Sequence, residues 1–279
     1  MENMLTTVGF KVKSLDELKG NVPAAFSPKQ DPNRSDKYSF VPTHELLALF
    51  AKLGWAPYSG KQNGKSPFAR HIVRLENPEF PFMDLKNDKV KPQIILDNSH
   101  NGSSSAKVHM GLFRLVCTNG LVVAMPGLYS GVKFRHIGLS FEEVKDLVEE
   151  TMTHYNVVGE HIGDMAARIL TPDEQLGFAV SAYAHRVGAR LFDEDGEVLI
   201  EKVLKEMNPD NVIMPLRDAD NGDDLWTKFN VIQERMVKGE FDKFATSGRK
   251  SHPRQLLNGV RNIEYNKVLW EVAEDYLDN

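Results

Sequence analysis

Residues 91–125, KPQIILDNSHNGSSSAKVHMGLFRLVCTNGLVVAM, hold more structurally specific residues than any other stretch of the chain. An apolar run, IIL, ends in the polar turn DNSHNG and a serine-rich tip. A second apolar run then reaches Cys117 and the sequence Thr118-Asn119-Gly120, which predicts another turn. Apolar runs joined by Asn, Gly and Ser are typical of a β-hairpin. We therefore expect 93–98 and 107–117 to be paired strands.

The sequence before residue 138 predicts mostly sheet. A helix is expected from Thr43 to Gly54, because its leucines and Phe50 recur at helical spacing and a glycine ends it. Residues 77–91, rich in proline and charge, are expected to be a connection. Further strands are predicted at 55–62, 69–76, 121–125 and 128–137.

The sequence after residue 139 predicts helices. Two capping boxes, Ser140–Glu143 and Thr171–Glu174, each mark a helix start, and Asp224–Lys238 has a strong apolar face. Shorter helical segments are expected near the C-terminal end. The predicted class is α+β, with an antiparallel sheet-rich N-terminal half followed by a helical C-terminal half. We expect an irregular basic arm at 1–40 and one α+β domain at 41–279, sheet-rich over 41–138 and helical over 139–279.

Composition excludes several classes of protein. Of 279 residues, 41% are hydrophobic, but no run approaches eighteen consecutive apolar residues, so no membrane span is expected. A single cysteine excludes an internal disulfide and a cysteine-based zinc site. Residues 1–11 lack a basic-then-apolar signal pattern, which favours the cytoplasm. Neither a complete phosphate-binding P-loop motif nor a dinucleotide-binding glycine motif occurs, and no cofactor is expected.

The net charge of -5 conceals an uneven distribution. Residues 1–138 carry a balance of +7, whereas 139–279 carry -12. Within the second half, 235–267 return to 8 basic against 3 acidic residues. Such asymmetry can mark a basic binding face. The competing interpretation, which we favour, is a solvated acidic helical surface beside an ordinary sheet.

Seven basic residues are the candidates for nucleic-acid contacts. Arg114 interrupts an apolar strand, where a charged side chain either faces water or is paired. On a groove, its planar guanidinium would hold a phosphate. Phe113 would point to the opposite face of a regular strand, so it cannot stack in the same groove. The candidate residues are Lys107, Arg114, Lys133, Arg135, Arg249, Lys250 and Arg254.

Metal or thiol chemistry is a weaker alternative. Asp97, His100 and His109 flank the hairpin turn and are weak candidates for metal ligands, but their spacing matches no established metal signature. A buried, hydrogen-bonded histidine in a structural turn is the competing interpretation of His100. Cys117 lies in an apolar segment, where a cysteine is usually a small buried hydrophobe. We expect no metal and favour a non-enzymatic protein.

Several blocks resemble a phage- and plasmid-borne family of unknown function that includes the YafZ and YfjQ proteins. The blocks are SHNGS (99–103), GLFRLVCTNGL (111–121), LWTKFNVIQE (225–234), RNI (261–263) and NKVLW (266–270). The resemblance spans about residue 35 to the C-terminal end, and Asn101 stands where many relatives are expected to carry Asp. The motif residues are His100, Gly102, Arg114, Cys117, Thr118, Asn119, Gly120, Trp226, Asn230, Gln233 and Trp270.

This resemblance implies a role in mobile-element DNA metabolism or in countering host defence, with no established activity to transfer. The predicted architecture is also similar to that of the single-strand annealing proteins of phage recombination, which is weak support for function. Three hypotheses follow. The first is non-enzymatic single-stranded DNA binding or annealing, with homo-oligomers formed between basic and acidic faces. The second is inhibition of a host defence complex through an acidic surface that binds protein. The third and least favoured is a metal-dependent hydrolase.

Overall fold

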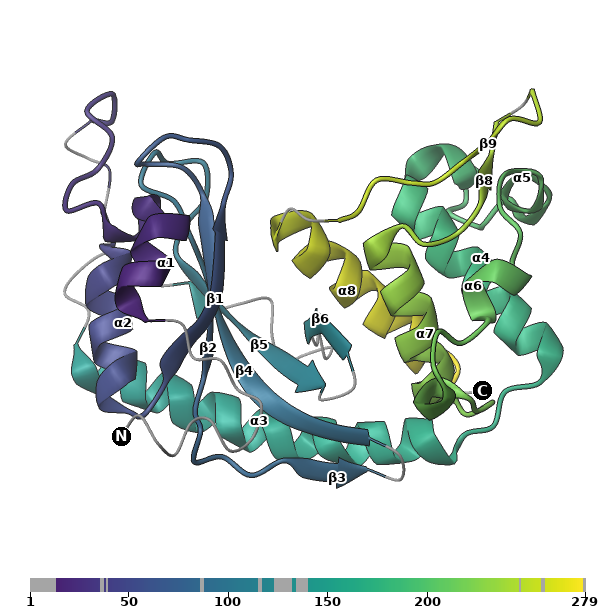
Figure 1. The fold of residues 1–279 in the computed structure, drawn as a ribbon, viewed down its shortest axis with the longest axis horizontal. Coiled ribbons are helices and arrows are strands. Elements are labelled where there is room, and N and C mark those ends of the chain that lie inside the picture. The colour runs from purple at the N-terminus through teal and green to yellow at the C-terminus, as the bar shows by residue number, and fades with distance from the viewer. Residues whose placement is uncertain are drawn as a thin grey trace.

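The computed structural model describes residues 14–35, 38, 40–85, 88–114, 117–122, 132–133, 140–245, 247–256 and 259–277. It confirms the α+β class, because the antiparallel sheet lies in the first half of the chain and most of the helix in the second (Figure 1). Part of the expected arm at 1–40 and candidate Arg135 lie outside the described residues.

The main sheet is antiparallel throughout its described pairings, with strand order β1-β2-β4-β5-β6. Two short strands extend it, since β3 pairs with β4 and β7 pairs with β5. The strands are β1 (Ala56–Gln62), β2 (His71–Glu76), β3 (Met83–Leu85), β4 (Asp88–Asn98), β5 (Lys107–Arg114), β6 (Cys117–Val122) and β7 (Val132–Lys133).

Two sequence predictions within the sheet are wrong. The segment 77–91 is not only a connection, because it contains β3 and the first residues of β4. Strand β4 continues through Pro92, since it pairs with β5 on both sides of this proline. The second error concerns Thr118-Asn119-Gly120, which continues strand β6 instead of forming a turn. The chain reverses earlier, between the paired residues Arg114 and Cys117.

Three α-helices and one 3-10 helix cover one face of the sheet (Figure 1). Alternating strand residues such as Val73, Leu75, Ile94 and Leu96 are buried against α1, α2 and the first part of α3. This arrangement follows from the period-two side-chain alternation of a strand. The helices here are α1 (Leu15–Asn21), the 3-10 helix η1 (Pro23–Phe26), α2 (Thr43–Lys52) and α3 (Phe141–Ala167).

The helical half begins where the capping boxes predict. Both boxes form reciprocal hydrogen bonds, at Ser140–Glu143 for α3 and at Thr171–Glu174 for α4. None of the described helices is long and apolar enough to cross a bilayer. The remaining elements are α4 (Pro172–Val187), η2 (Ala189–Leu191), α5 (Ile200–Glu206), α6 (Asp210–Ile213), η3 (Asp218–Asp220), α7 (Leu225–Lys238), β8 (Lys243–Phe244), β9 (Lys250–Ser251) and α8 (Gly259–Glu274).

Helix α3 contributes to both large hydrophobic clusters. Its first turns, including Val144 and Leu147, pack with the sheet and α2. Its later turns, including Val158 and Ile162, pack with α4, α7 and α8. Gly159 permits a close approach between α3 and β3, because a Cβ there would lie 2.2 Å from the Cε atom of Met83.

A buried ion pair joins the sheet to the helical half. Nη2 of Arg114, on β5, donates to Oδ1 of Asp220 over 2.6 Å, and both side chains are buried. Arg217 contacts the other oxygen of Asp220 at 3.1 Å and also donates to Glu234 of α7. Lys238 completes the chain of charges by pairing with Glu234. Arg114 therefore lies inside the protein, where it is unavailable to a ligand on the surface.

Replacing Arg114 with Ala should lower the free energy of unfolding by about 3 kcal/mol, because the buried Asp220 then loses its hydrogen-bonded cation and keeps only the contact with the partly exposed Arg217. Chemical denaturation of the Arg114→Ala, Asp220→Asn and double variants measures this effect. We expect the two effects to be strongly non-additive, with a coupling of about 1 to 3 kcal/mol. Simple additivity would show that the two side chains do not stabilise the fold as a pair.

Candidate nucleic-acid interface

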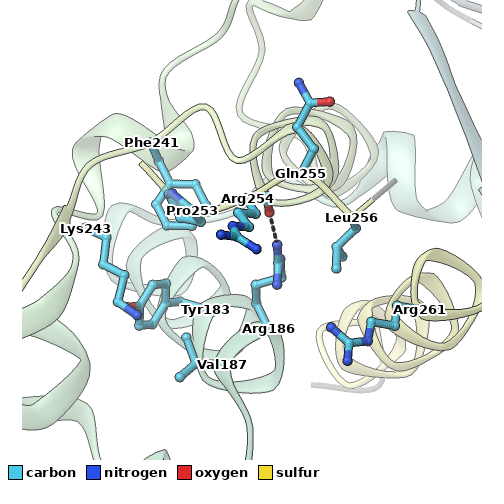
Figure 2. A pocket seen from close by; sticks show the side chains of 10 residues that line it. All are labelled: Tyr183, Arg186, Val187, Phe241, Lys243, Pro253, Arg254, Gln255, Leu256 and Arg261. Atoms are coloured by element: carbon cyan, nitrogen blue, oxygen red, sulfur yellow. Dashed lines mark hydrogen bonds between the residues drawn. The ribbon is translucent and has the colours of Figure 1, made fainter. Parts of the chain in front are cut away.

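A pocket of about 460 Å³ lies in the helical half, between α4, the start of α8 and the segment that follows α7 (Figure 2). Four of its ten described lining residues are basic and none is acidic. We call it the basic pocket. It is lined by Tyr183, Arg186, Val187, Phe241, Lys243, Pro253, Arg254, Gln255, Leu256 and Arg261.

Arg186 is the fixed cation of the basic pocket. Its Nε atom donates to the carbonyl oxygen of Met236 over 3.1 Å, and Nη2 donates to the carbonyl oxygen of Arg254 over 2.6 Å (Figure 2). Burial lowers its pKa, and the nearby charge of Arg261 contributes in the same direction. These two hydrogen bonds hold the guanidinium in place at the last turn of α4, so little side-chain entropy is lost when it binds an anion.

The other cations come from separate elements. Lys243 lies on β8, Arg254 lies on the segment 253–256, and Arg261 lies in the first turns of α8. Arg254 and Arg261 are exposed, whereas Lys243 is half-buried. The aromatic residues Tyr183 and Phe241 pack against each other, with their ring centroids 5.8 Å apart. Both rings are buried, so they form a wall of the pocket and offer no free face for stacking.

Gly239 fixes the position of the 253–256 segment. It ends α7 with a φ of 70°, a left-handed conformation that favours glycine. A Cβ atom at this position would lie 2.2 Å from the carbonyl oxygen of Pro253. The segment is held further by a hydrogen bond of 2.8 Å from the amide of Leu256 to the carbonyl oxygen of Val237. Any side chain at 239 would therefore displace one wall of the basic pocket.

The structure separates the basic residues that the sequence singles out. Of these, Arg254 lines the basic pocket, while Arg249 is exposed near strand β9. Lys250 forms an ion pair of 2.6 Å with Asp242. Lys107 and Lys133 are register partners on β5 and β7. Arg114 is buried, as described above, and Arg135 lies outside the described residues.

Three pocket cations, Arg186, Lys243 and Arg261, were not predicted. They are far apart in the sequence, and no local cluster of charge marks Arg186 or Arg261. Only the basic excess over 235–267 points toward this region, and it includes Lys243 and Arg261.

The residues considered as weak metal candidates do not form one group. Asp97 accepts two hydrogen bonds from Arg70, at 2.8 and 2.6 Å, and lies 3.9 Å from Nε2 of His109. Burial alone would raise the pKa of Asp97, but these two neighbours lower it overall. His100 has different partners. Among the described residues, no set of three His, Cys, Asp or Glu side chains is placed to hold a metal ion.

His100 belongs to a buried hydrogen-bond network around Thr43. Nδ1 of His71 lies 2.8 Å from the carbonyl oxygen of Ala69, so it carries the proton and Nε2 is left as an acceptor. The Thr43 hydroxyl donates to that Nε2 over 2.7 Å. The hydroxyl oxygen then accepts from Asn98 at 2.9 Å and from Nε2 of His100 at 3.2 Å. The hydroxyl is thus fully used in holding the turn, which supports the structural interpretation of His100.

The chain was compared with known proteins. A family model described as "Domain of unknown function (DUF932)" matches residues 32–270. The chain belongs to the DUF932 family. It is similar to two proteins of Escherichia coli (strain K12). UPF0380 protein YafZ is 30% identical over 267 residues, which cover 94% of this chain and 90% of YafZ. UPF0380 protein YfjQ is 29% identical over 267 residues, with the same coverage of both chains. No solved structure matches the chain.

The family resemblance seen in the sequence is therefore confirmed. The motif residues whose burial the structure describes lie mainly in the interior. Trp226 stacks on Phe229 with ring centroids 5.9 Å apart. Trp270, on α8, forms an edge contact with the same Phe229 ring, with centroids 5.7 Å apart. Gln233 donates to the buried Asn266 over 2.9 Å. These contacts join α7 to α8. Packing of the helical half thus accounts for Trp226, Gln233 and Trp270 of the motif.

The Thr43 network makes stability depend on pH. Burial lowers the pKa of His100 from 6.5 to about 3, and burial also lowers the pKa of His71. The unfolded chain therefore takes up protons at a higher pH than the folded one. The contribution of His100 to stability should be complete above pH 6.5 and decline as the pH falls toward 3, by up to about 1.4 kcal/mol per pH unit. The contribution of His71 should change in the same direction.

Thermal or urea unfolding between neutral and mildly acidic pH tests this prediction. The control is His100→Asn, which should be less stable at neutral pH and show a flatter decline on acidification. Parallel pH profiles for the two proteins would exclude His100 as a source of the acid sensitivity.

Proposed function

We propose that this DUF932 protein is a non-enzymatic, cytoplasmic single-stranded DNA-binding protein of mobile-element DNA metabolism, which binds phosphates in the basic pocket. The observation that carries the proposal is the convergence of Arg186, Lys243, Arg254 and Arg261 on one recess with no acidic residue among its described lining. Cations that neutralise phosphates release condensed counterions, which provides the main driving force for such binding.

The shape of the pocket favours a single strand over a duplex. A flexible strand can place a phosphate inside a recess, whereas a duplex is stiff over far longer distances than one pocket. The arginines present planar guanidinium groups, which match the geometry of phosphate oxygens. Arg249 is exposed and extends the positive charge beyond Lys243 along the same chain segment. The bound DNA would follow this charge out of the pocket.

The role in annealing rests on the wider resemblance described above, and it requires more than one copy of the chain on a strand. The acidic exposed face of α3 provides a surface that a basic neighbour would contact, which is how we propose that oligomers form.

The Arg261→Gln/Lys243→Gln variant should bind a fluorescent oligothymidylate at least about ten-fold more weakly than the wild type at low salt. The reason is that two cations no longer neutralise phosphates of the strand. The slope of the logarithm of the binding constant against the logarithm of salt concentration should also become shallower, by about 0.7 for each phosphate that is no longer neutralised. Fluorescence anisotropy over a range of salt concentrations measures both quantities.

Lys202→Gln/Lys205→Gln is the matched control, because Lys202 and Lys205 are exposed lysines of α5 that do not line the basic pocket. It should bind like the wild type. Equally weakened binding in the control and pocket variants would show that overall charge, and not the pocket, determines binding. If the wild type shows no salt-sensitive binding at low ionic strength, single-stranded DNA is not its ligand.

The second candidate function is protein binding by the acidic face of α3, as in an inhibitor of a host defence complex. Glu142, Glu143, Asp146, Glu149 and Glu150 are all exposed on the first turns of this helix. A row of carboxylates of this kind resembles the charge of a nucleic acid and steers basic partners.

Reversing these five charges to lysine should abolish capture of a basic host partner from lysate. Capture is measured by affinity purification and mass spectrometry, with circular dichroism to confirm folding. Alanine substitution of exposed Glu194 and Asp195, in a loop away from α3, is the control. Unchanged capture by the reversed variant would exclude this face as the binding surface.

A further inference from the structure

A second pocket adjoins the basic pocket. It has a volume of about 510 Å³ and shares Gln255 and Leu256 with the basic pocket, so the two recesses meet at one chain segment. It lies between the first two strands of the sheet and the ends of α7 and α8 that face them. The two recesses are therefore neighbours.

The lining of the second pocket differs in character from that of the basic pocket. Ile72, Val237 and Leu256 supply an apolar surface. Its charges are mixed, because Glu240 stands among the cations and Lys238 is already paired with Glu234. This composition suits an uncharged, flat group with polar edges better than a second phosphate.

Arg74, on β2, lines this pocket. Its Nη1 atom contacts Oε1 of Gln93 at 3.3 Å, which orients the guanidinium, and the side chain is half-buried. Burial lowers its pKa to about 10, so it is still positively charged at neutral pH. Ser59 is its register partner on β1, so the two side chains project from the same face of the sheet. Guanidinium planes stack on nucleobases, as they do on aromatic rings.

We propose that the second pocket, here called the base pocket, binds a nucleobase of the strand whose phosphate occupies the basic pocket. The base would stack on Arg74 and rest on Ile72 and Leu256, while the Gln255 amide contacts its polar edge. This inference rests on the proposed DNA binding and adds to it a contact that phosphates alone do not provide. The proposal predicts that the protein prefers a strand with bases over a strand without them.

The test compares oligothymidylate with a strand of equal length that consists of abasic sites, by anisotropy at one salt concentration. The wild type should bind the strand with bases at least about five-fold more tightly, because stacking on one base contributes at least that factor. Ser59→Trp should remove this preference by filling the base pocket, and should leave affinity for the abasic strand unchanged. Ser59→Ala is the matched control and should keep the preference.

The outcomes separate the two proposals. Equal binding of both strands by the wild type, or a preference that survives Ser59→Trp, would overturn the base pocket but leave phosphate binding intact. Failure of the wild type to bind either strand would overturn both. Should Ser59→Trp fail to fold, ultraviolet crosslinking of a bromouracil-substituted strand to the wild type replaces it. Crosslinks in peptides that contain 59–61 or 72–74 would support the base pocket, and crosslinks confined to other peptides would overturn it.

Discussion

The chain of buried charges from Arg114 to Lys238 determines how the sheet meets the helices. Burying Asp220 and Glu234 would be costly without partners, so each carboxylate needs cations in fixed places. Arg217 contacts both of them, while Arg114 brings its charge from β5. Burial alone would raise the pKa of Glu234, yet hydrogen bonds from Lys238 and Arg217 lower it overall. Within this chain of charges, the ion pair of Arg114 with Asp220 is the link between the sheet and the helical half.

The same chain of charges shapes the proposed ligand site. Lys238 lines the base pocket, but its ammonium is engaged by Glu234 and is not free to attract a phosphate. The basic pocket has no such internal acid in its described lining. The base pocket and the basic pocket therefore differ in charge. A lysine of the base pocket belongs to the chain of buried charges, whereas no described residue of the basic pocket does. This difference is the physical basis for assigning a phosphate to one pocket and a base to the other.

Local signals in the sequence were sufficient for most of the fold. The capping boxes at Ser140 and Thr171 placed α3 and α4, since both boxes depend on residues three positions apart. The extent of β4 through Pro92 was missed because its pairing partners lie elsewhere in the chain. The site was harder to predict, as its cations are assembled by tertiary packing and only Arg254 was singled out. In the sequence, Arg114 is a charged residue in an apolar strand, and its partner is not evident. The structure shows its partner, Asp220, which is 106 positions away.

Gly239 gives the proposed site an unusual dependence on a residue that has no side chain. It touches no proposed ligand, yet its left-handed backbone and its close approach to Pro253 set the segment shared by both pockets. Relatives that differ in all four pocket cations could still keep the recess if they keep this glycine. A relative without the glycine would have to rebuild the recess even with every cation retained. The shape of the recess and its charge thus depend on different residues of the chain.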